Sequence, residues 1–115
     1  MKAALFAFNG DPMCFVHVLL NALDLKEKGY EVKVVVEGSA TKLIRTFHED
    51  ENAPFAPLYR KCKEAGLFDG TCKACTAKMG ATEAAEAEGF TFLADMSGHP
   101  SVSRYMQDGY QIITF

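Results

Sequence analysis

The chain has 115 residues, of which 49% are hydrophobic and 23% charged, and its formal net charge is −3. This length and balance are typical of a soluble globular protein, so we expect residues 1–115 to fold as one domain. An acidic chain without a basic stripe is not typical of a nucleic-acid-binding protein. No apolar run approaches the ~20 residues of a membrane span. Four irregularly spaced cysteines and an N-terminus without an export signal indicate a reduced, cytoplasmic protein.

The first third of the chain has the pattern of strand, helix and strand. Residues 2–8 form a nearly continuous apolar run, which is typical of a buried parallel strand. Asp11 and Pro12 are a favourable N-cap and first residue for a helix that Gly29 ends. Residues 31–37 then form a β-branched strand. Such a unit requires parallel pairing and a right-handed crossover.

The rest of the chain alternates between helical and extended patterns. We expect a short amphipathic helix around 43–47, a helix over 55–65, a weak strand over 67–72, one helix from there to 88, a strand over 90–93, a short helix up to 107 and a closing strand over 110–115. Strands that alternate with helices throughout indicate a three-layer α/β/α sandwich with a mainly parallel sheet of about five strands.

The residues best suited to chemistry are Cys72 and Cys75, which form a C-x-x-C with Lys73 between them and Lys78 following. Backbone N–H groups at a helix start and cationic side chains lower a thiol pKa, so we expect Cys72 to be an exposed, reactive thiolate. Paired cysteines in a cytosolic chain favour redox, metal or sulfur chemistry over packing. Cys62 shares the apolar face of its helix and is expected in the core.

Loops that follow parallel strands gather at the carboxyl edge of the sheet, where ligands bind. Asn9 and Asp11 follow the first strand, and Cys14 lies just inside the next helix. His99 is the only histidine expected in a loop at this edge. These four residues, together with the two lysines, are candidates for binding a substrate or tuning a thiol.

Three segments resemble the DsrE-like family of sulfur-relay proteins (DsrE, DsrF and DsrH). Residues 72–80, Cys-Lys-Ala-Cys-Thr-Ala-Lys-Met-Gly, are similar to the family's active-site segment, in which a cysteine after the third strand precedes a glycine by eight positions. Asn-Gly-Asp-Pro at 9–12 and Tyr-Gln-Ile-Ile-Thr-Phe at 110–115 resemble its opening loop and last strand. The resemblance implies a homo-oligomer, often a trimer or hexamer. We expect no cofactor. It also implies that Cys72 carries a persulfide between sulfur-donor and sulfur-acceptor proteins.

Three other functions stay open on the sequence. A C-x-x-C thiol redox switch would form a Cys72–Cys75 disulfide, although the surroundings are not those of a thioredoxin site. Structural zinc needs four ligands, and without a second close cysteine pair we expect no metal. The only conceivable zinc ligands are Cys62, Cys72, Cys75 and His99. The third alternative is a non-catalytic ligand-binding or interaction subunit with idle cysteines.

Overall fold

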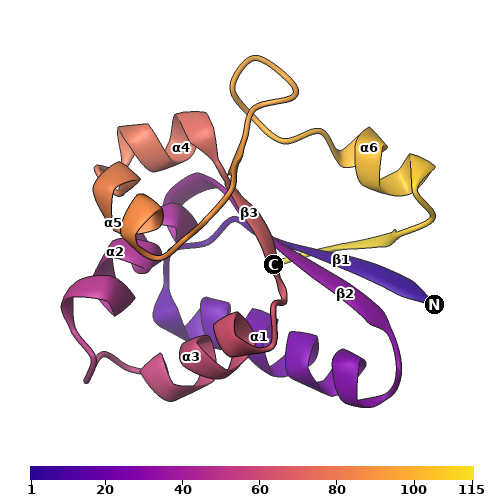
Figure 1. Cartoon of the computed structure of the whole chain (residues 1–115), viewed down its shortest axis with the longest axis horizontal. Coiled ribbons are helices and arrows are strands. Elements are labelled where there is room, and N and C mark those ends of the chain that lie inside the picture. The colour runs from indigo at the N-terminus through magenta and orange to yellow at the C-terminus, as the bar shows by residue number, and fades with distance from the viewer.

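Five parallel strands form one sheet with the order β4-β3-β2-β1-β5 (Figure 1). The structure is a computed structural model and describes all 115 residues. It confirms the expected three-layer α/β/α sandwich. No helix is both long and apolar enough to span a bilayer. The elements are β1 (Lys2–Ala7), α1 (Pro12–Glu27), β2 (Glu31–Val36), the 3-10 helix η1 (Gly38–Thr41), α2 (Lys42–Glu49), α3 (Ala56–Glu64), β3 (Phe68–Cys72), α4 (Lys73–Lys78), α5 (Thr82–Ala87), β4 (Phe92–Leu93), α6 (Val102–Gln107) and β5 (Gln111–Thr114).

The strand order determines which face each helix covers. From β1 to β4 the chain crosses the sheet in one direction, and it then returns to place β5 on the other side of β1. Because crossovers between parallel strands are right-handed, the return step puts its helix on the opposite face. Helix α6 therefore lies apart from α1 and α3, across the sheet (Figure 1).

The two faces bury very different amounts of apolar surface. The core under α1, α2, α3 and α5 contains 22 buried residues, whereas the core under α6 contains six. In the large core, Phe47 stacks on Tyr59 with ring centroids 4.5 Å apart. In the small core, the rings of Phe6 and Tyr105 pack edge to face, with their centroids 5.3 Å apart. The second face is thus thinly covered by the chain.

A half-buried ion cluster around Glu88, which we call the Glu88 cluster, joins the helices of the well-covered face. Its carboxylate accepts hydrogen bonds from Tyr59 at 2.7 Å, Arg60 at 3.0 Å and Lys63 at 3.1 Å, and lies 2.8 Å from His48 Nδ1. Burial alone would raise the pKa of Glu88, but hydrogen bonds from His48, Tyr59 and Lys63 outweigh it and lower the pKa to about 2. The end of α5 is therefore held to α2 and α3 by an ionised carboxylate.

Two expected elements differ from the structure. The single helix expected from the cysteines to residue 88 is wrong, because the chain breaks into α4 and α5. Gly80 has a φ of 69°, a left-handed conformation that glycine adopts at low cost, and its N–H bonds to the carbonyl of Ala77. The strand expected over 90–93 is confined to Phe92–Leu93.

Candidate functional site

Cys72 is the last residue of β3 and the N-cap of α4. Its strand partner is Leu93, which belongs to the small core under α6. Because paired residues of parallel strands point to the same side, Cys72 also points to the thinly covered face. The preceding residue, Thr71, points to the other face, where its hydroxyl lies 2.8 Å from that of Thr76 in α4. This contact fixes the start of α4 against the strand end.

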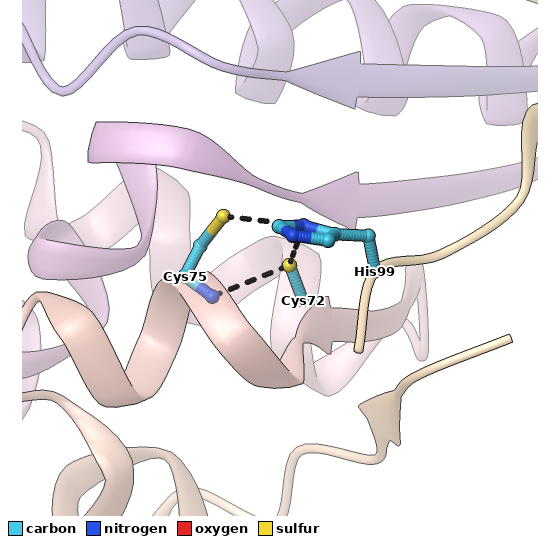
Figure 2. Close-up of side chains that lie close together, drawn as sticks. All are labelled: Cys72, Cys75 and His99. Carbon is cyan, nitrogen blue, oxygen red and sulfur yellow. Dashed lines mark hydrogen bonds between the residues drawn. The ribbon is translucent and has the colours of Figure 1, made fainter. Parts of the chain in front are cut away.

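Cys72, Cys75 and His99 form one cluster, which we call the Cys–Cys–His cluster (Figure 2). The Cys72 Sγ lies 3.1 Å from His99 Nδ1, and the Cys75 Sγ lies 3.7 Å from the same nitrogen. The backbone N–H of Cys75 donates to the Cys72 Sγ at 3.4 Å. The histidine comes from the loop between β4 and α6, so the cluster joins two separate segments. The sequence places His99 in a loop at this edge as a candidate for tuning a thiol, and in the structure its Nδ1 lies within reach of both sulfurs.

A tight turn holds His99 in place. Met96 and His99 exchange backbone hydrogen bonds of 2.7 and 2.9 Å, and Ser97 and Gly98 between them have positive φ angles of 49° and 88°. The carbonyl of Gly98 accepts a 2.9 Å hydrogen bond from the N–H of Ala74, in the first turn of α4. The turn over residues 96–99 is therefore docked on the helix that carries Cys75.

The expectation of an exposed, acidified Cys72 is wrong. The residue is 0% exposed, and burial raises the pKa of Cys72 to about 11 against the effect of the Cys75 N–H, which lowers it. Lys73 and Lys78 are exposed and donate no hydrogen bond to either sulfur. The strand end directs Cys72 beneath the 96–99 turn, where its sulfur lies 3.6 Å from the carbonyl oxygen of Gly98. The basic group in contact with the thiol is His99.

Glu37 is a member of the site that the sequence did not reveal. It directly follows β2, is only 7% exposed, and has its pKa raised to about 7 by burial. Its charge also raises the pKa of Cys72, which follows the neighbouring strand. A carboxylate after a β-branched strand, at the edge that also carries the cysteines, was the available signal.

The remaining candidates lie outside the Cys–Cys–His cluster. Asn9 accepts the N–H of Asp11 at 2.8 Å, and Asp11 caps α1 by accepting the N–H of Met13 at 2.8 Å. Cys14 lies in the first turn of α1 and is not among the cluster's ligand atoms. Cys62 is in the large core, as expected, and is not available to complete a four-ligand zinc site with the cluster.

The fold and the cluster define a small parallel α/β protein with paired cysteines and a histidine at the carboxyl edge of its sheet. The model of the DsrE/DsrF-like family matches residues 2–115, and the chain belongs to that family. An uncharacterized protein of Methanocaldococcus jannaschii is 36% identical over 99 residues, which are 85% of this chain and 77% of that protein.

Two shorter matches are to uncharacterized proteins of Archaeoglobus fulgidus. One is 50% identical over 40 residues, which are 35% of this chain and 66% of that protein. The other is 40% identical over 37 residues, which are 32% of this chain and 100% of that protein. No solved structure matches the chain.

Proposed function

We propose that this protein is a cytoplasmic sulfur carrier, which holds a persulfide on Cys72 and passes it from a donor protein to an acceptor protein. Membership of the DsrE/DsrF-like family supports a role of the sulfur-relay type. The observation that carries the proposal is the 3.1 Å distance between the Cys72 Sγ and His99 Nδ1. A buried thiol needs a base within hydrogen-bonding reach to become a nucleophile, and His99 supplies it.

Sulfur loading then proceeds as an exchange at the outer sulfur of a donor persulfide, R–S–SH. His99 Nδ1 accepts the proton of the Cys72 thiol, and the thiolate attacks the outer sulfur. The donor S–S bond breaks, and R–S⁻ leaves with the proton from His99. The products are Cys72–S–SH and R–SH, so one sulfur has moved and no external oxidant or reductant is consumed.

The surroundings of Cys72 suit both storage and delivery. The buried Cys72 sulfur is shielded from solvent, while Cys75 and His99, which both contact it, are partly exposed. An acceptor thiolate attacks the outer sulfur, forms a persulfide on the acceptor and leaves a thiolate on Cys72. The Cys75 N–H stabilises that thiolate.

The second candidate function is a redox switch, favoured by the position of Cys75. Its sulfur lies within 4.8 Å of the Cys72 sulfur and shares the same histidine. Attack of the Cys75 thiolate on the inner sulfur of Cys72–S–SH would form a Cys72–Cys75 disulfide and release HS⁻. In that case, the protein would release sulfide instead of delivering sulfur to a partner.

The test is to load the reduced protein with an organic persulfide and to follow its intact mass. A carrier gains about 32 Da for one added sulfur. We expect Cys72→Ser to lose this adduct and Cys14→Ser, outside the cluster, to retain it. We expect His99→Ala to load about 10²-fold more slowly, with part of the rate restored by added imidazole.

The fate of the adduct separates the candidate functions. A carrier keeps its persulfide with the same lifetime in wild type and in Cys75→Ser. A switch converts it to a species about 2 Da lighter than the reduced protein and releases sulfide, and Cys75→Ser abolishes that conversion. A folded protein that never gains sulfur would contradict both and leave the non-catalytic binding subunit.

A further inference from the structure

The Cys–Cys–His cluster has the spacing of a metal site. The two sulfurs and His99 Nδ1 all lie within 4.8 Å of one another. Zinc bonds of about 2.3 Å to sulfur and about 2.0 Å to nitrogen place these two ligand atoms about 3.5 Å apart at a tetrahedral angle. The S–N distances in the cluster are 3.1 Å for Cys72 and 3.7 Å for Cys75, on either side of that value. For the two sulfur–nitrogen pairs, a bound ion therefore requires shifts of only a few tenths of an ångström.

The chemistry of the cluster selects the kind of ion. Thiolate and imidazole ligands suit zinc and other soft or borderline metals, whereas calcium and magnesium take oxygen ligands. No carboxylate belongs to the cluster. Three protein ligands also differ from a closed structural site, which has four, and match the zinc sites that keep one position open.

The ligands are held in place before any ion binds. Cys72 is fixed by β3, and Cys75 by the first turn of α4. The hydrogen bond from Ala74 to Gly98 ties the 96–99 turn, and with it His99, to the same helix. The Cys75 N–H points at the Cys72 sulfur, where it stabilises the negative charge of a coordinated thiolate.

We propose that Cys72, Cys75 and His99 bind one Zn²⁺ per chain and leave its fourth position open to water or an external thiol. On binding, the two thiols release their protons to solvent, and no electron is transferred. The zinc proposal does not rest on the sulfur-carrier function, although both use Cys72 and His99. If both exist, they compete, because a sulfur coordinated to zinc is a poorer nucleophile toward a donor persulfide.

The binding test uses the full chain, reduced with a phosphine and freed of metal. Titration with Zn²⁺ against a chromogenic chelator should give one equivalent per chain. Titration with Co²⁺ should give thiolate-to-cobalt absorption in the near ultraviolet and intense visible bands of a tetrahedral ion.

Each of Cys72→Ser, Cys75→Ser and His99→Ala should weaken binding by about 100-fold or more. Cys14→Ser, a cysteine outside the cluster, should bind as wild type does, and circular dichroism should show that all four variants are folded.

Absence of stoichiometric zinc binding, or unchanged affinity in the three cluster variants, would overturn the site. Sulfur loading of zinc-bound and zinc-free protein then distinguishes this proposal from the carrier function. Gain of sulfur without zinc binding overturns the zinc site and leaves the carrier. Zinc binding without any gain of sulfur overturns the carrier and leaves the zinc site. Equal loading rates with and without one equivalent of zinc overturn the competition between them.

Discussion

The two cysteines of the cluster differ in how accessible their sulfurs are to a reagent. Cys75 is partly exposed, whereas Cys72 is buried beneath the 96–99 turn. Cys62 is also buried, has its pKa raised to about 11 by burial, and has one hydrogen bond, which its thiol donates to the carbonyl of Leu19 at 3.6 Å. Accessibility and a basic neighbour both affect how fast a thiol reacts.

We therefore predict that Cys75 is alkylated first, Cys72 more slowly and Cys62 last. The measurement is mass mapping after timed exposure to iodoacetamide near neutral pH, in a Cys14→Ser background that removes the other partly exposed thiol. In denaturant the three rates should converge, which serves as the control. If Cys72 reacted fastest in the folded protein, the shielding of its sulfur would be contradicted.

The sequence predicted the composition of the cluster better than its geometry. The spacing of Cys72 and Cys75 and the loop position of His99 placed all three at one sheet edge. The direction of Cys72 depends on how β3 pairs with its neighbours, and the pairing with β2 shifts register between Val34 and Val35. An irregularity of that kind leaves no simple period in the sequence. Burial of Cys72 was not predictable for the same reason.

At the scale of elements, the 96–99 turn couples backbone conformation to the cluster. We predict that Gly98→Ala lowers the free energy of unfolding by about 1 kcal/mol, because a side chain is disfavoured at a φ of 88°. The added methyl group would also lie 3.2 Å from the Cβ of Ala74 and push the turn away from α4. Sulfur loading should slow as His99 moves with the turn.

Gly109→Ala is the matched control for this prediction. Gly109 has nearly the same φ, 87°, but a methyl group there meets nothing within 4 Å. Urea unfolding should therefore show that Gly109→Ala loses no more stability than Gly98→Ala does, while its sulfur loading stays at the wild-type rate. Equal loading by both variants would contradict the coupling of the turn to His99.

The Glu88 cluster predicts a loss of stability in acid. Since its pKa is about 2 in the folded protein and about 4.5 as an ordinary value, its stabilising effect is present above about pH 4.5. It is lost as the pH falls from there toward 2. Glu88→Gln should lower the free energy of unfolding by about 2 kcal/mol at neutral pH and by less at pH 3.

Urea unfolding of wild type and Glu88→Gln across this pH range measures the effect. Glu86→Gln, an exposed carboxylate in the same helix, is the control and should change stability little. If the difference in free energy of unfolding between wild type and Glu88→Gln stayed constant from pH 3 to 7, it would contradict a stabilising role of the ionised Glu88 carboxylate.

The elements themselves were largely predictable, because apolar periodicity and glycine stops mark them in the sequence. The break between α4 and α5 was not predictable, since alanine and lysine before Gly80 and alanine and glutamate after it all favour helix. The length of strand β4 was overestimated for a related reason. Phe90 packs into the large core from outside the strand, so its apolar side chain reports burial and not pairing.

At the scale of the whole molecule, the thin second face and the two sheet edges favour self-association. Edge strand β5 exposes Ile113, which is 41% accessible, and Phe8, Met96 and Met106 are also large, exposed apolar residues. We predict a symmetric homo-oligomer, a trimer or hexamer, by sedimentation at micromolar concentration. Ile113→Lys should weaken the assembly if β5 lies in the interface. A wild-type protein that sediments only as a monomer would contradict the prediction.

The strand order also has a consequence for the newborn chain. His99 follows Cys75 by 24 residues, and β5, which completes the sheet beside β1, comes later still. At roughly 5–20 residues per second, translation leaves the two thiols without their histidine for about 1 to 5 seconds. During that interval a nascent chain presents a bare C-x-x-C to the thiols, oxidants and metal ions of its surroundings. The turn over residues 96–99, which covers the cluster, is therefore made only after the cysteines that it shields.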